Sequence, residues 1–320
     1  MESRTALGRS SLQVPRLGVG AMTWGDPKGL ARLHPAKTAY GGAHGIEEER
    51  RAVDESIAAG VNLFDTAAMY SGGAAERRLG ELTRGKDVLI ATKFPGSFSF
   101  KVEDLPRELE ANLARLGRSS IDLYQHHFPN ARLSIPKLMD QLADAVEAGK
   151  AKAVGVSNYS VEQMRAAHEA LARRGIPLAS NQVEYSLLHR QPETNGVLQA
   201  CRELGITLIA YTPLAGGLLT GKYSAQNRPG GFFRRILPQY SRKAMDAIQP
   251  VVALLRQMGE KYSKTPSQVA LRWLIENPIV LPIPGAKNGK QAIDNTEALK
   301  FSLTPEEVEM LSQATLAWRA

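Results

Sequence analysis

The chain has 320 residues, of which 43% are hydrophobic and 22% charged, and this composition excludes an intrinsically disordered protein. Its formal net charge of +8 is compatible with anionic ligands but does not require nucleic acid as a partner. The single cysteine, Cys201, excludes an internal disulfide. Since no apolar run approaches the roughly 20 residues of a membrane span, we expect a cytoplasmic protein that does not associate with membranes.

Eight short segments are predicted to be strands because each is rich in β-branched or other apolar residues and too short to be a solitary helix. They lie at residues 17–25, 62–67, 88–94, 121–128, 151–158, 179–185, 207–213 and 279–283. Amphipathic segments separate them, and three of these begin with a capping box, at Ser160, Thr265 and Thr304. A further helix around Ile248 contains Pro250, which predicts that this helix starts late or bends.

The strands and helices alternate without a linker or a break in composition. We therefore predict that residues 1–320 form one domain, a (β/α)8 TIM barrel, rather than two doubly wound domains. An open Rossmann sheet would need G-x-G-x-x-G at its first strand-to-helix turn. The segment that begins Gly18-Val19-Gly20 lacks the third glycine.

Two polar segments interrupt this alternation, at residues 26–45 and 214–241. Both follow a predicted strand, so both are expected to leave the C-terminal face of the barrel, where active sites are built. The second segment and the residues just after it contain no acidic residue. Their cations are Lys222, Arg228, Arg234, Arg235, Arg242 and Lys243. This basic segment is either a solvated surface or a region that attracts a phosphate-bearing molecule or an anionic carbonyl substrate.

Four polar residues near the ends of consecutive strands form a set that can handle protons without a metal. A tyrosine hydroxyl, with an ordinary pKa of ~10, is a poor acid at neutral pH. We expect the Lys93 ammonium to lower the pKa of Tyr70, and Asp65 to keep Lys93 charged. One histidine of the pair His126 and His127 can orient a carbonyl oxygen, while strand alternation directs the two to opposite faces and disfavours a metal-binding pair.

Seven sequence motifs, in chain order, resemble those of the aldo-keto reductases. They are LFDTAAMY (63–70), ATKF (91–94), IDLYQHHFP (121–129), VGVSNYS (154–160), NQVEYS (181–186), AYTPLAGGLLTGKY (210–223) and IPGAKNGKQAIDN (283–295). Within that family, the loop after the seventh strand is similar to that of the branch containing potassium-channel β subunits and plant-type pyridoxal reductases. The resemblance implies a (β/α)8 barrel that binds NADPH without a Rossmann fold and reduces an aldehyde or ketone to an alcohol.

The resemblance also implies a role for individual residues. The catalytic tetrad would be Asp65, Tyr70, Lys93 and His127, with Tyr70 as the proton donor. The cofactor residues would be Ser157, Asn158, Gln182, Tyr211, Leu214, Gly216, Gly285, Lys287, Gln291 and Asn295. No metal is implied. We expect Trp24, Phe94 and Phe128 to line the substrate pocket.

One departure from the family pattern concerns the adenosine end of the cofactor. Many members carry an arginine at the position of Gln291 to hold the 2′-phosphate, and here the nearby cation is Lys287. An ammonium discriminates less sharply by geometry than a guanidinium, so the preference for NADP(H) over NAD(H) stays open.

Other functions have weaker support in the sequence. The segment from Gly216 to Lys222 is close to a P-loop, but Tyr223 occupies the position of the Mg²⁺-binding hydroxyl. Nucleic-acid binding lacks basic motifs flanked by aromatic residues. A cofactor-sensing regulatory subunit with little turnover is the main alternative, because the channel-associated relatives also keep the tetrad.

Overall fold

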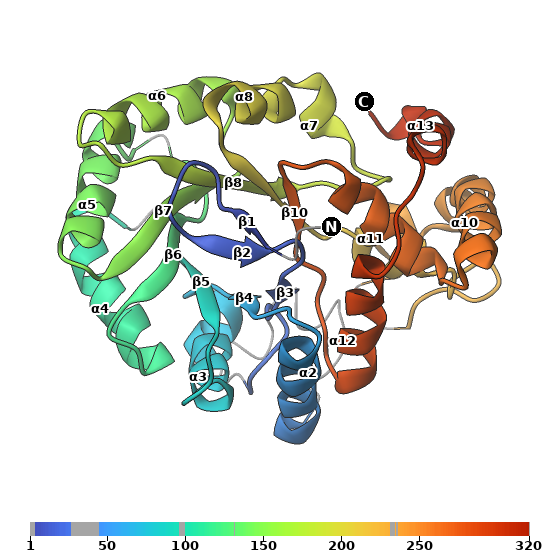
Figure 1. The fold of residues 1–320 in the computed structure, drawn as a ribbon, viewed down its shortest axis with the longest axis horizontal. Helices are drawn as coiled ribbons and strands as arrows, with labels where there is room; N and C mark the ends of the chain where they lie inside the picture. The colour runs from blue at the N-terminus through green and yellow to red at the C-terminus, as the bar shows by residue number, and fades with distance from the viewer. Residues whose placement is uncertain are drawn as a thin grey trace.

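Eight parallel strands curve around a common axis in the computed structural model, which describes residues 4–26, 45–95, 100–130, 132–230, 234 and 236–319 (Figure 1). In chain order and in spatial order they are β3 (Val19–Gly20), β4 (Leu63–Asp65), β5 (Leu89–Phe94), β6 (Ile121–His126), β7 (Ala151–Ser157), β8 (Leu178–Glu184), β9 (Thr207–Tyr211) and β10 (Val280–Pro282). The N–H groups of Gly18 and Gly20 donate to the carbonyl oxygens of Pro282 and Pro284, each over 3.0 Å, and so join the last strand to the first. The predicted barrel is confirmed.

Helices cover the outside of the barrel. They are α2 (Ile46–Ala58), α3 (Ala74–Leu82), α4 (Leu105–Leu116), α5 (Ile135–Glu147), α6 (Val161–Ala172), α7 (Gln191–Thr194), α8 (Val197–Leu204), α10 (Arg242–Tyr262), α11 (Pro266–Glu276), α12 (Gly289–Thr296) and α13 (Pro305–Ala314). Short 3-10 helices occur at η2 (Tyr70–Gly73), η3 (Val102–Asp104), η4 (Ala215–Thr220), η5 (Pro238–Tyr240), η6 (Glu297–Leu299) and η7 (Leu316–Trp318). Within the described residues, no helix is both long enough and apolar enough to cross a membrane.

Local sequence signals account for several helix boundaries. The predicted capping boxes at Ser160, Thr265 and Thr304 are present, each with its side chain accepting from the N–H three residues later. The prediction of a late start for the helix around Pro250 was wrong, because α10 begins at Arg242. The Ser241 hydroxyl caps its first turn, and buried side chains ahead of Pro250 hold that part of the helix against its neighbours.

A β-hairpin that the sequence analysis did not predict lies at one end of the barrel. Strands β1 (Arg4–Ala6) and β2 (Gln13–Pro15) pair antiparallel, and Leu7, Leu12 and Val14 join the apolar cluster inside the barrel. These short strands lack the long apolar run that identified the others. The hairpin closes the N-terminal end of the barrel, so the opposite face is the open one.

The side chains that point into the barrel form two layers. The lower layer is apolar and consists of Leu63, Ala91, Leu123, Ala153, Ala179, Ile209 and Leu281. Two residues further along their strands, Leu63 is followed by Asp65, Ala91 by Lys93 and Leu123 by Gln125. Because side chains i and i+2 face the same side of a strand, these polar groups form the next layer toward the C-terminal face.

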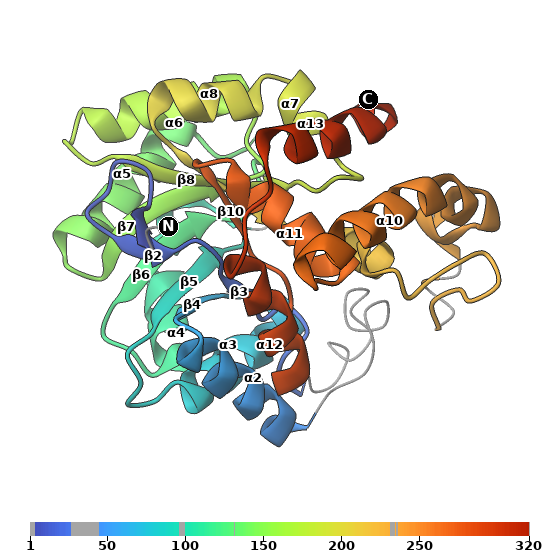
Figure 2. The same cartoon turned by 45° about the vertical axis from the view of Figure 1, so that its right-hand side comes forward.

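The two predicted insertions lie between a strand and the following helix. The segment at 26–45 lies outside the described residues apart from its two ends. The segment at 214–241 follows β9, contains η4 and η5, and leads into α10. Figure 2 shows α10 beside the barrel, next to α11 and α13.

Helices α3 and α4 touch at a glycine, which gives a test of this packing. A Cβ at Gly80 would lie 2.3 Å from the carbonyl oxygen of Leu116. In an open helix, Gly→Ala would be stabilising by ~1 kcal/mol. Here we expect Gly80→Ala to lower the free energy of unfolding, measured by urea denaturation, by ~1–2 kcal/mol, since the backbone of α4 must move.

The matched control is Glu81→Ala, which changes an exposed position of the same helix. It should alter the free energy of unfolding by less than ~0.5 kcal/mol. An increase in stability for Gly80→Ala would contradict the close contact between the two helices.

Candidate active site

The centre of the polar layer is a buried ion pair between two adjacent strands. The Lys93 Nζ on β5 donates to Asp65 Oδ1 over 2.5 Å and to the Thr66 carbonyl oxygen over 2.8 Å. Lys93 is fully buried, and Asp65 at the end of β4 is nearly so. Burial lowers the pKa of Lys93, while Asp65 acts in the opposite direction. The pair therefore places a positive charge inside the barrel only because a carboxylate accompanies it.

Tyr70 lies in η2, just after β4, at the edge of this layer. The Lys93 Nζ is 5.3 Å from the centre of the Tyr70 ring, and the ring meets that of His127 edge-on at 5.6 Å. Burial and the Asp65 carboxylate raise the pKa of Tyr70 well above its ordinary value. The expected net lowering of this pKa was wrong, because burial and the Asp65 carboxylate outweigh the Lys93 ammonium. The phenol consequently keeps its proton at neutral pH.

The two adjacent histidines face opposite sides of the barrel wall, as predicted. On the outer side, His126 Nδ1 is 2.7 Å from the Tyr159 hydroxyl, and its ring packs near Phe94. On the inner side, His127 is almost completely buried and its Nδ1 has no hydrogen-bond partner among the described residues. Burial, Lys93 and His126 together lower the pKa of His127 to about 2, so its imidazole is neutral.

A group of amide and hydroxyl side chains adjoins His127. Asn158 has a left-handed backbone, with φ 60°, which turns its side chain back over the barrel mouth. Its Nδ2 donates to Ser157 Oγ over 3.0 Å and to the His127 carbonyl oxygen over 3.2 Å, and its Oδ1 accepts from the Tyr211 hydroxyl over 3.0 Å. Four residues from three strand ends therefore form one connected network.

Gln182 on β8 connects this network to the ion pair. Its Nε2 donates to Asp65 Oδ2 over 2.9 Å, and its backbone carbonyl accepts from Ser157 Oγ over 2.8 Å. The structure therefore brings the four predicted tetrad residues together with the predicted nicotinamide residues Ser157, Asn158, Gln182 and Tyr211.

The remaining predicted cofactor residues lie on two segments at the same mouth. In the turn before α12, Gln291 Oε1 accepts from the Lys287 N–H over 2.9 Å, and Asn295 Nδ2 donates to the Gly285 carbonyl over 3.2 Å. Two of these side chains thus hold the turn in shape. Leu214 precedes η4, and Gly216 within η4 has a left-handed backbone, with φ 64°.

Arg234 is a residue that the sequence analysis did not single out from the basic segment. Its guanidinium donates to the Gly216 carbonyl and lies over the Tyr240 ring at 5.1 Å. Burial lowers the pKa of Lys287, and the charge of Arg234 lowers it further. Two cations from distant parts of the sequence therefore approach each other beside η4. The sequence of the segment that carries Arg234 has no hydrophobic periodicity, so this proximity could not be predicted from it.

Comparison with known proteins identifies the family of the chain. The family model described as the aldo/keto reductase family matches residues 16–315. The chain belongs to the aldo/keto reductase family. Among curated members of the family it is 37% identical to an uncharacterized oxidoreductase of Mycobacterium tuberculosis, an alignment that covers 96% of this chain and 91% of the relative. It is 34% identical to the chloroplastic pyridoxal reductase of Arabidopsis thaliana, over 95% of this chain and 84% of the relative.

A third aldo-keto reductase, from Schizosaccharomyces pombe and named for NADP(+), is 33% identical over 94% of this chain and 88% of its own length. Among solved structures of the family, the glycerol dehydrogenase from Gluconobacter oxydans has a TM-score of 0.81 and 26% identity, over 98% of this chain and 95% of that chain. These similarities establish an oxidoreductase family and its barrel fold.

The three aromatic residues that were expected in the substrate pocket differ in position. Trp24 is fully buried, and its Nε1 donates to the Ala286 carbonyl over 2.7 Å. Phe94 is fully buried on the outward side of β5. Both side chains belong to the core, so the prediction was wrong for them. Strand alternation puts Phe94 opposite Lys93. Phe128 is 41% exposed and stacks on His127 with ring centres 4.3 Å apart.

The neutral state of His127 makes stability depend on pH. Since its pKa is lowered to about 2 in the folded protein, the unfolded chain binds the proton first when the pH falls below ~6.5. Stability is therefore lost as the pH falls, by ~2 kcal/mol per histidine at pH 5. We expect His127→Gln to reduce the difference between the unfolding free energies at pH 7 and pH 5 by this amount, as measured by urea denaturation.

His126, whose pKa burial lowers to about 4, provides an internal comparison. His126→Gln should reduce the same difference by a similar amount, because this group also stays neutral at pH 5. An unchanged pH dependence in both variants would show that the folded protein accepts these protons.

Proposed function

We propose that the protein is an NADPH-dependent oxidoreductase that reduces an aldehyde or ketone to an alcohol. The principal support is that Tyr70, Lys93, Asp65 and His127 meet in one polar layer at the open end of the barrel. A protonated phenol, a buried ammonium and a neutral imidazole are the groups that a carbonyl reduction needs around the oxygen atom.

The residues at the mouth fit a nicotinamide dinucleotide. Amide and hydroxyl groups of Ser157, Asn158 and Gln182 are suited to a carboxamide, and the aromatic face of Tyr211 to a flat ring. Lys287 and Arg234 provide positive charge at the other end, near Gly216. Anionic phosphates would relieve the repulsion between these two cations. When bound, the cofactor supplies a hydride to the carbonyl carbon.

The protein's own part in the reaction is to orient the carbonyl oxygen and protonate it. The neutral His127 imidazole offers an N–H group that can hold this oxygen. As negative charge develops there, the Tyr70 hydroxyl donates its proton. Lys93 then stabilises the phenolate that remains, and Asp65 keeps Lys93 charged and in place. The raised pKa of Tyr70 ensures that the acid form is present before each turnover.

Replacement of Tyr70 tests the proton donor. We expect Tyr70→Phe to lower kcat for reduction of a panel of aldehydes by ~10²–10⁴-fold, because it removes the acid without removing the ring. The dissociation constant for NADPH, measured by fluorescence quenching, should change less than about threefold, since the hydroxyl does not take part in the predicted cofactor contacts.

Tyr159→Phe is the matched control, since it removes a buried hydroxyl on the outer side of the barrel wall. It should retain turnover. Parent-like turnover by Tyr70→Phe would remove Tyr70 from the reaction. Tight NADPH binding without reduction of any aldehyde by the parent protein would support the cofactor-sensing subunit instead.

Replacement of Lys287 tests the cofactor preference. Gln291 already holds the turn through the Lys287 N–H, so Lys287 is the side chain of this turn that can bind a 2′-phosphate. We expect Lys287→Ala to raise KM for NADPH by ~10–100-fold, the effect of losing a hydrogen bond to a charged group, and to change KM for NADH much less.

The control for this experiment is Lys290→Ala, which removes an exposed cation three residues later. It should leave both KM values within about twofold of the parent, because exposed charges contribute little. Equal increases in KM for NADPH and NADH in Lys287→Ala would exclude Lys287 from 2′-phosphate recognition.

A further inference from the structure

A cavity separate from the tetrad lies between the end of β8, η4, α10 and the C-terminal segment. Its volume is about 390 Å³. None of the tetrad residues lines it, and neither does Lys287, but Gly216 of the predicted cofactor residues does. Apolar side chains form most of its wall, and these include Leu188, Leu218, Ile248 and Trp318. A cavity of this size with an apolar wall is within the range that small ligands occupy.

An unpaired carboxylate faces this apolar wall. Glu184, the last residue of β8, lines the cavity and is only partly exposed. In the part of the chain that the structure describes, its carboxylate has neither an ion pair nor a hydrogen bond. Other acidic residues of the interior are paired, as Glu49 is with Arg78 and Glu76 with Arg115. An unpaired carboxylate beside an apolar surface is unfavourable in free energy because it loses hydration without gaining a partner. A bound cation would supply that partner.

The charge of Glu184 acts within the cavity wall itself. Burial raises the pKa of Tyr240, another lining residue, the Arg234 guanidinium over its ring lowers it, and the more weakly acting charge of Glu184 raises it. A positive and a negative charge therefore both lie at this wall, and of the two Glu184 is the one that lines the cavity. A neutral ligand would leave its carboxylate unpaired and less hydrated.

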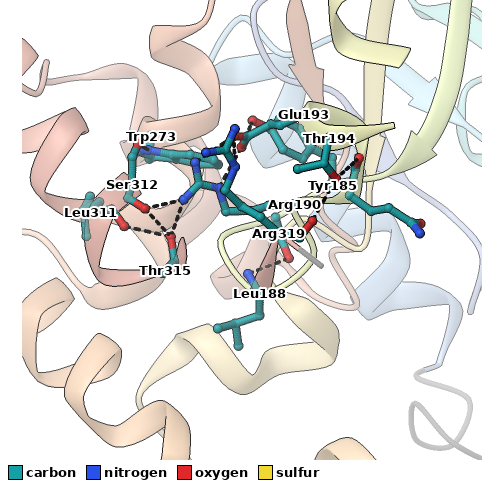
Figure 3. A network of polar contacts seen from close by, with 12 residues as sticks. Tyr185, Leu188, Arg190, Glu193, Thr194, Trp273, Leu311, Ser312, Thr315 and Arg319 are labelled. Atoms are coloured by element: carbon teal, nitrogen blue, oxygen red, sulfur yellow. Dashed lines mark hydrogen bonds and ion pairs between the residues drawn. The ribbon is translucent and has the colours of Figure 1, made fainter. Parts of the chain in front are cut away.

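The wall that contains Trp318 is held by a buried arginine (Figure 3). Arg190, which is 4% exposed, binds both carboxylate oxygens of Glu193 over 2.7 Å and donates to Thr315 Oγ1 over 2.9 Å. Its backbone N–H donates to the Trp318 carbonyl over 2.8 Å, and its guanidinium lies 5.4 Å from the centre of the Trp273 ring. The C-terminal segment is thus fixed to the β8–α7 connection, so the cavity is preformed and binding need not order it.

We propose that this cavity binds a small organic cation, namely a primary amine on an aromatic or branched aliphatic body. The ammonium pairs with the Glu184 carboxylate in a charge-assisted hydrogen bond. The body of the amine packs against Ile248 and Leu218 and the Trp318 ring, which also attracts a neighbouring positive charge. This site contains none of the tetrad residues and meets the predicted cofactor residues at Gly216, and its existence does not depend on the proposed reductase activity.

Calorimetric titration of the intact protein tests the proposal with two probes of similar shape, benzylamine and the uncharged benzyl methyl ether. We expect benzylamine to bind at least tenfold more tightly than the ether. Glu184→Gln should weaken benzylamine binding at least tenfold, because it removes the charge and keeps the shape of the side chain. Ile248→Trp, which fills the cavity, should abolish binding of both probes.

The matched control is Asp246→Asn, which removes an exposed negative charge from α10 outside the cavity. It should leave the affinity for benzylamine within twofold of the parent, and benzylamine should still bind when NADPH is saturating. Equal affinity for the ether, or unchanged benzylamine affinity in Glu184→Gln, would overturn the proposal. Displacement of benzylamine by NADPH would also overturn it, by assigning the cavity to the dinucleotide.

Discussion

The buried ion pair between Lys93 and Asp65 is the interaction on which the interior of the barrel depends. An ammonium without a partner would not stay charged at this depth, and a carboxylate alone would be equally unfavourable. Asp65 also accepts from Gln182 on the far side of the barrel, so one carboxylate connects β4, β5 and β8. The ion pair packs directly on the apolar layer that contains Leu63 and Ala91, two residues earlier on the same strands.

Burial and the ion pair together determine the protonation of the neighbouring groups. Burial favours the neutral forms of His127 and Tyr70, while Lys93 disfavours a second positive charge on His127 and Asp65 a second negative charge on Tyr70. Each neighbour is thereby held as a neutral hydrogen-bond donor. A site of this kind is prepared for negative charge that appears on a bound oxygen atom, which is the condition for electrostatic stabilisation of a transition state.

Much of this arrangement could be predicted from the sequence. The positions of Asp65 and Lys93 at strand ends predicted that they belong to one set, strand alternation separated His126 from His127, and the strand segments predicted the barrel. The direction of the pKa shift of Tyr70 could not be predicted, because it depends on how deeply the fold buries the phenol and on how near the Asp65 carboxylate lies. Trp24 and Phe94 are as apolar as pocket residues would be, and only their packing shows that they belong to the core.

Other features had no sequence signal because they arise from contacts between distant segments. Arg234 and Lys287 approach each other across more than fifty positions of the chain, and Arg190 binds residues of the C-terminal segment. The sequence also does not show that Glu184 is unpaired among the described residues, because this depends on which side chains the neighbouring elements place beside it.

The hairpin formed by β1 and β2 closes one of the two ends of the barrel. Leu7, Leu12 and Val14 fill the lower opening with apolar side chains, so within the part of the chain that the structure describes Lys93 is approached from the opposite face. Molecules that bind at the polar layer therefore enter and leave at the same face. When two of them bind together, the one that lies deeper must arrive first and depart last.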